Sequence, residues 1–138
     1  MFTESQQSTL RAVLDRLIPA DDYPGAWDAG VGDYIARQVQ GDSRHLLTSY
    51  RLGLNAVDAE AVTAYGRHFA ELYPAQQDAL LTNLERGVTG TSWLTPAAGF
   101  MSTLIQHTAE GYYADPAQGG NRVARSWAMM AFDQAGRP

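Results

Sequence analysis

The sequence predicts an all-α fold, a single-domain helical array over residues 1–138 with about five to seven helices joined by long ordered loops. Apolar residues recur at intervals of three and four positions through most of the chain, as on one buried face of a helix. No alternation of apolar and polar residues is long enough to indicate a strand, and no internal repeat is visible. A chain of 138 residues can bury a core of its own without covalent cross-links.

The first helix is predicted near the N-terminus. Five apolar residues there share one helix face: Leu10, Val13, Leu14, Leu17 and Ile18. Thr3 followed by Gln6 is typical of a capping box at the start of a helix. Pro19 closes the helix, and residues 20–25 are rich in turn-forming types, which indicates a compact loop.

Two further helices are predicted in the next forty residues or so. The shorter one covers residues 31–39, and Gly41 follows its end. The longer one covers residues 43–64 as a single helix. Its packing seam consists of Leu47, Tyr50, Leu54, Val57 and Ala61. Gly53 either weakens this helix locally or lets a neighbour approach closely.

The second half of the chain shows clear boundary signals. Phe69 and Leu72 mark a short helical segment, and Pro74 suits the first position of a helix that Gly87 terminates. That helix carries Leu80, Leu81 and Leu84. Thr95 is predicted as the cap of the next helix and Pro96 as its first-turn proline.

The helix after Pro96 has a continuous predicted core face. Its members are Phe100, Met101, Leu104, Ile105, Thr108 and Tyr112. A last short helix is predicted to hold Trp127, Met130 and Phe132.

Composition excludes several classes of function. The formal net charge is −5, and all ten basic residues are arginines scattered along the chain, so nucleic acid is not expected as a partner. There is no cysteine, which excludes disulfides and thiolate metal sites. No apolar run reaches the ~18 residues of a membrane span, and no leader is visible. We expect a cytoplasmic location without direct membrane insertion, or a periplasmic one if a leader has been removed.

His107 and Glu110 are the residues that most invite a catalytic or metal interpretation. Their spacing of three places them on one side of a helix, as in carboxylate-bridged di-iron bundles. Such bundles need a second histidine pair and two further glutamates, and the chain contains no Glu-x-x-His motif. The simpler interpretation places His107 at the rim of the core, with a ring nitrogen bonded to the backbone. Glu110 then lies nearer to solvent and bonds to the following loop or to a partner's arginine.

No other catalytic signature is present in the sequence. No serine lies in a Gly-x-Ser-x-Gly elbow, and no strand precedes a glycine-rich phosphate loop. The chain also lacks a fingerprint for a flavin or nicotinamide. We therefore assign no catalytic residue, no metal ligand and no cofactor to this chain.

Residues 107–122 combine polar, aromatic and turn-forming types in a way that a plain helical bundle does not need. Tyrosine and arginine are enriched at interface hot spots, and conformationally restricted loops often carry function. We interpret this segment and the loop of residues 21–30 as a partner interface. The candidate residues are Asp21, Asp22, Pro24, His107, Glu110, Tyr112, Tyr113, Asp115, Pro116, Gly119, Gly120, Asn121 and Arg122. For Trp127 a core position is the preferred interpretation.

Several segments, taken in order, carry a resemblance to one family: residues 15–22 and 24–26, 28–31, 50–51 and 53–54, 74–77, and 107–122 with its Glu-Gly-Tyr-Tyr centre and Gly-Gly-Asn-Arg end. Together they resemble the small subunit, subunit 3, of gluconate 2-dehydrogenase and related flavin-dependent sugar dehydrogenases. They extend over nearly the whole chain. The combination is specific, whereas each segment alone is not.

The resemblance implies an accessory role. In such complexes a large flavoprotein of the glucose-methanol-choline type holds FAD and the catalytic histidine, and the small subunit supports its folding, stability or export. A sugar, glycoside or sugar acid loses a hydride to FAD, and electrons pass to a cytochrome or another acceptor. Many members begin with a twin-arginine leader, which this sequence does not show. Two alternatives remain: an independent enzyme that uses His107 and Glu110, and a helical adaptor for another partner.

Overall fold

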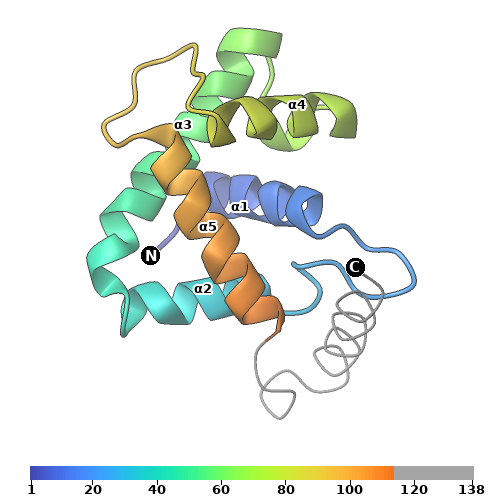
Figure 1. Cartoon of the computed structure of the whole chain (residues 1–138), viewed down its shortest axis with the longest axis vertical. Helices are drawn as coiled ribbons and strands as arrows, with labels where there is room; N and C mark the ends of the chain where they lie inside the picture. The colour runs from blue at the N-terminus through green and yellow to red at the C-terminus, as the bar shows by residue number, and fades with distance from the viewer. Residues whose placement is uncertain (114–138) are drawn as a thin grey trace, which may run out of the picture.

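The computed structural model describes residues 1–113. This part of the chain contains five α-helices and no strand, which confirms the predicted all-α class (Figure 1). The helices are α1 (Glu4–Leu17), α2 (Val31–Gln40), α3 (Leu47–Tyr65), α4 (Pro74–Glu85) and α5 (Ala97–Tyr112). Two 3-10 turns, η1 (Arg44–Leu46) and η2 (Phe69–Glu71), precede α3 and α4. The predicted last helix with Trp127, Met130 and Phe132 lies outside the described residues.

Local sequence signals account for most helix ends. The predicted capping box of α1 is present, because the Gln6 amide donates to Thr3 Oγ1 and the Thr3 amide donates to Gln6 Oε1. Pro74 is the first residue of α4, as predicted. Gly87 follows that helix with a φ of 77°, which a residue with a side chain rarely adopts.

The long predicted helix over residues 43–64 is divided in the structure. Residues Arg44–Leu46 form the 3-10 turn η1, and the regular helix begins at Leu47. Gly53 serves close packing, since a Cβ atom there would lie 2.2 Å from Cε1 of the Phe100 ring. The expected close approach of a neighbour at Gly53 is therefore confirmed, and the neighbour is α5.

Two predictions about α5 are wrong. Thr95 is not the cap, because Pro96 has an extended ψ of 130° and occupies the cap position itself, so the helix begins one residue later. Ile105 is 36 % exposed and does not belong to the core face. His107 takes that place, because the buried stripe continues from Leu104 to His107 and Thr108 rather than turning toward residue 105.

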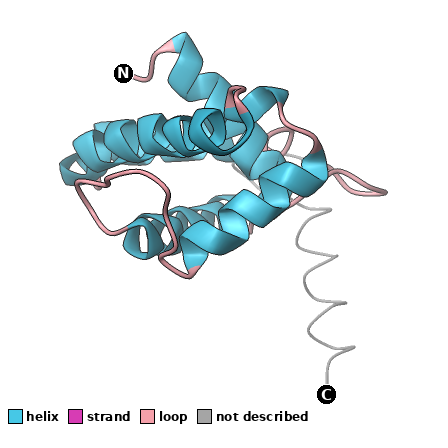
Figure 2. Cartoon of the chain, turned by 90° about the horizontal axis from the view of Figure 1, so that it is seen from above, coloured by secondary structure: helices cyan, strands magenta, loops and turns pink. Residues whose placement is uncertain are grey.

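Helix α5 lies at the centre of the array. It contacts each of the other four helices. The C-terminal part of α5 crosses in front of α2 in the view of Figure 1. Seen from above, the described part consists of helices and connecting loops (Figure 2). The largest fully buried side chains include Tyr50, Phe69, Leu54, Met101 and Tyr112.

Candidate functional site

The C-terminal half of α5 and the loop between α1 and α2 meet in the structure. The Tyr112 hydroxyl donates a hydrogen bond to the carbonyl oxygen of Pro24 at 2.6 Å. One residue earlier, Gly111 lies against α2, since a Cβ atom there would be 2.8 Å from Cδ2 of Tyr34. Two segments that the sequence singles out, 88 residues apart at this contact, therefore touch each other inside the fold.

His107 points into the core. Its side chain is 8 % exposed, and its Nδ1 atom lies 2.7 Å from the Tyr50 hydroxyl on α3. The two rings are stacked, with centroids 5.8 Å apart. The expected bond from the ring to the backbone is wrong, because a buried hydroxyl on another helix takes its place.

The Tyr50 hydroxyl stays protonated and can donate a hydrogen bond. Burial, followed by the nearby charge of Glu110, raises the pKa of Tyr50 well above its ordinary value of 10. The phenol therefore keeps its proton at neutral pH and can donate to Nδ1 of His107. The pair locks α3 to α5 rather than exposing an imidazole to a substrate.

Glu110 lies at the surface between α5 and α2. Its carboxylate accepts hydrogen bonds from the Tyr34 hydroxyl and from Nε2 of Gln106, both at 3.2 Å. Partial burial raises the pKa of Tyr34, and the charge of Glu110 raises it further. Glu110 thus positions α2 against the end of α5.

The loop residues differ in their exposure. Asp21 and Asp22 are exposed, and Pro24 is half-buried. The Asp21 carboxylate accepts the Tyr23 amide at 2.9 Å, which tightens the turn. Tyr113 is the C-cap of α5 and is half-buried, and its ring meets that of Tyr112 edge-on, with centroids 5.0 Å apart.

Six of the predicted interface residues lie outside the described residues: Asp115, Pro116, Gly119, Gly120, Asn121 and Arg122. Within residues 1–113, no group of three or more histidine, aspartate and glutamate side chains is placed to hold a metal ion. In the same part of the chain, no helix has the length and apolar character needed to cross a membrane.

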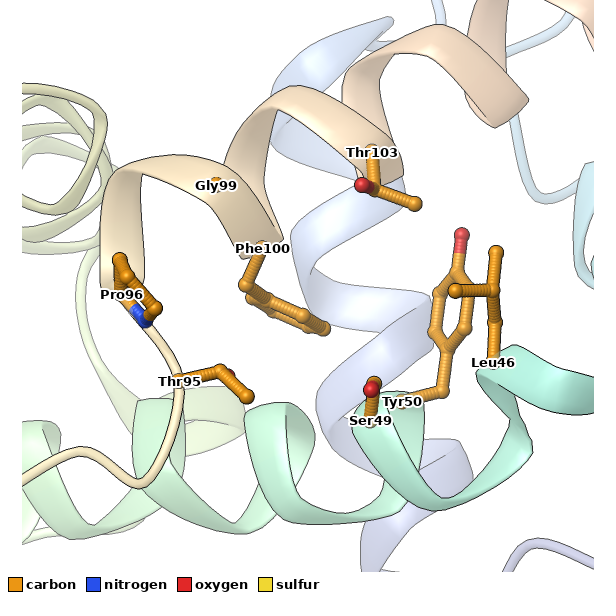
Figure 3. A pocket seen from close by; sticks show the side chains of 8 residues that line it. All are labelled: Leu46, Ser49, Tyr50, Thr95, Pro96, Gly99, Phe100 and Thr103. Atoms are coloured by element: carbon orange, nitrogen blue, oxygen red, sulfur yellow. The ribbon is translucent and has the colours of Figure 1, made fainter.

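An apolar pocket lies between the N-terminal turns of α3 and α5, at a place that sequence reasoning missed (Figure 3). Its volume is about 270 Å³, and none of its lining residues is charged. The lining residues are Leu46, Ser49, Tyr50, Thr95, Pro96, Gly99, Phe100 and Thr103. One sequence signal is available in retrospect, because residues 87–109 contain no Asp, Glu, Lys or Arg.

Comparison with known proteins identifies one family. The model of the family described as gluconate 2-dehydrogenase subunit 3 matches residues 4–133. No curated protein matches the chain, and no solved structure matches it. The family consists of small subunits of multi-subunit, FAD-dependent sugar dehydrogenase complexes.

Proposed function

The chain belongs to the gluconate 2-dehydrogenase subunit 3 family, and on this premise we propose that it is the non-catalytic small subunit of a heteromeric FAD-dependent dehydrogenase. The large subunit is a flavoprotein of the glucose-methanol-choline type, which binds FAD and oxidises a sugar, glycoside or sugar acid. Electrons then pass to a cytochrome or another acceptor. The chain described here supports the folding and stability of that flavoprotein.

The match of the family model over residues 4–133 is the observation that carries this proposal. This match includes both segments that we interpret as the partner interface, residues 107–122 and the loop that contains Asp21, Asp22 and Pro24. The Tyr112–Pro24 hydrogen bond supports the assignment of the two segments to one interface, because it joins the end of α5 to the loop after α1. The exposed carboxylates of Asp21 and Asp22 lie in that loop and suit arginine side chains of a partner.

Co-expression with the large flavoprotein tests the proposal. The tagged chain is captured, and the mass and visible absorption spectrum of the captured material are measured. We expect a yellow heteromer whose flavin belongs to the larger chain. A colourless protein of 15.0 kDa, captured alone although the flavoprotein is present in the extract, would refute the proposal.

Two variants test the interface. Tyr113→Ala and Arg122→Ala are expected to weaken the complex by about tenfold or more, as truncation at an interface hot spot does. The far-ultraviolet circular dichroism of the isolated chain should change little. Arg86→Ala, at an exposed position after α4, is the matched control. If both variants bind the flavoprotein as tightly as the wild-type chain, the interface lies elsewhere.

A further inference from the structure

The pocket between α3 and α5 has a volume that suits a single side chain of another protein. Its volume is about 270 Å³. A cavity of ~150 Å³ is already large enough to bind benzene. The pocket is smaller than the roughly 300–1,000 Å³ typical of small-molecule sites. The rings of Phe100 and Tyr50 face the pocket (Figure 3), and the polar side-chain groups of Ser49, Thr95 and Thr103 are uncharged hydroxyls.

We infer that this pocket receives one uncharged aromatic or branched aliphatic side chain of the large flavoprotein subunit. The inference rests on the proposed function, because that function supplies the partner. It adds a contact that the sequence did not predict, on the opposite half of α5 from residues 107–113. Tyr50 connects the two places, since its ring lines the pocket and its hydroxyl bonds His107.

The glycines inside the helices support an external occupant. A Cβ atom at Gly32 would collide with Trp27, one at Gly53 with Phe100, and one at Gly111 with Tyr34. Each of these glycines is therefore explained by packing within the chain. Gly99 differs, because it lines the pocket and a Cβ atom there would meet nothing within 4 Å among the described residues.

Gly99 also has no conformational reason to be glycine. The glycines with positive φ in residues 1–113 are Gly30, Gly66 and Gly87, and Gly99 lies in the first turn of a regular helix. Alanine is the better helix former, so glycine lowers the stability of the isolated chain at this position. An occupant from outside that approaches the backbone closely accounts for the missing side chain.

The surface around the pocket suits a protein partner rather than a sugar. Leu94 is 84 % exposed and Val88 is 57 % exposed, both on the loop that leads to the pocket rim at Thr95 and Pro96. This loop and the five pocket residues from Thr95 to Thr103 lie in a stretch, residues 87–109, without Asp, Glu, Lys or Arg, within a chain of net charge −5. The cores of protein interfaces are depleted in charge in this way.

The loop is held in place before any partner binds. The carboxylate of Glu60, on α3, accepts the Gly90 amide at 2.7 Å and the Thr91 hydroxyl. The Val88 amide donates to the Asn83 carbonyl oxygen at 2.8 Å. Because these bonds hold Val88, Gly90 and Thr91, this part of the loop loses little conformational entropy when a partner covers it.

A leucine at position 99 provides the test. Gly99→Leu fills the pocket from the protein's own side, and Ala79→Leu is the matched control at an exposed position of α4. The wild-type chain and both variants are titrated against the purified large subunit. We expect Gly99→Leu to weaken binding by about tenfold or more and Ala79→Leu to bind like wild type. Leu94→Ser, at a position too exposed to disturb folding, should also weaken binding.

The outcomes separate this inference from the proposed function. If wild type binds the flavoprotein and Gly99→Leu and Leu94→Ser bind equally well, the inference is wrong and the proposed function stands. If wild type does not bind at all, the proposed function fails. A lower melting temperature of isolated Gly99→Leu would show that the chain itself fills the pocket. A dimer that Gly99→Leu makes monomeric, or saturable binding of gluconate to the isolated chain that Gly99→Leu abolishes, would assign the pocket to another occupant.

Discussion

The two halves of α5 differ in what their side chains contact. In the C-terminal half, His107, Glu110 and Tyr112 each bond to a residue of another part of the fold, namely Tyr50, Tyr34 and Pro24. In the N-terminal half, Gly99 and Thr103 line an open apolar pocket. The titratable side chains of α5 are thus engaged in contacts within the fold, whereas a glycine and a threonine line the open pocket.

This difference changes how His107 and Glu110 are interpreted. A histidine and a glutamate three residues apart suggest chemistry when only the sequence is considered. In the structure they fasten α5 to α3 and α2, and so hold the helix that carries the pocket. The contacts of His107, Glu110 and Tyr112 therefore fix the position of α5, and Gly99 in its N-terminal half is a place where binding can be tested without breaking these contacts.

The largest expected effect comes from breaking the buried pair. Tyr50 is 1 % exposed, and His107→Ala leaves its hydroxyl without a partner and opens a cavity beside it. We expect a loss of about 2–4 kcal/mol in the free energy of unfolding, measured by urea denaturation. Glu110→Gln is the control, because it keeps an oxygen for the Tyr34 hydroxyl at the surface. A loss below ~0.5 kcal/mol for His107→Ala would mean that the pair does not stabilise the fold.

Helix ends were the most predictable part of the fold. Thr3 with Gln6, Pro74 and Gly87 act through bonds and dihedral angles within a few residues, so the sequence contains the necessary information. The start of α5 was displaced by one residue for a different reason. Whether Pro96 is the cap or the first helical residue depends on its ψ angle, because the proline ring fixes φ but leaves ψ free, and the observed ψ of 130° is not helical.

The core face of α5 and the pocket were less predictable because both depend on distant residues. Periodicity assigns apolar residues inward, so Ile105 was placed in the core and His107 at its rim. The partner that makes burial of His107 possible is Tyr50, 57 residues earlier. The meeting of residues 21–24 with the end of α5 was likewise not visible in sequence, because the Tyr112–Pro24 hydrogen bond joins residues 88 positions apart.

The second prediction compares two glycines on the same helix. Gly111→Ala forces a methyl group against the Tyr34 ring, and we expect a loss of about 1–3 kcal/mol in unfolding free energy. Gly99→Ala places the same group in open space, and the better helix propensity of alanine should add up to about 1 kcal/mol. Opposite signs in parallel urea titrations would support the contrast. If Gly99→Ala also destabilises the chain, the space at the pocket is not open.

The third prediction concerns the link between α5 and the loop after α1. Tyr112→Phe removes the hydroxyl that bonds the Pro24 carbonyl and should cost about 1 kcal/mol. Amide hydrogen exchange in residues 20–25 should accelerate, because this bond ties the loop to the core. Tyr65→Phe, at an exposed position, serves as the control. Unchanged exchange in the loop would show that other contacts hold it.

The smallest expected effect belongs to a second histidine, and it sharpens the contrast between buried and exposed partners. His68 is exposed, and its Nδ1 lies 2.7 Å from the Asp58 carboxylate, which also accepts the Phe69 amide at 2.8 Å. The hydrogen bond to Asp58, and then its charge, raise the pKa of His68 above 6.5. The stabilisation is therefore complete below pH 6.5 and is lost as the pH rises through the folded-state value. Nuclear magnetic resonance titration should find the pKa of His68 above 6.5 in the wild-type chain and lower in Asp58→Asn, which keeps an acceptor for the Phe69 amide but removes the charge. A wild-type pKa at or below 6.5 would contradict the ion pair, whereas the expected shift with little change in stability identifies it as a surface contact, unlike the His107–Tyr50 pair in the core.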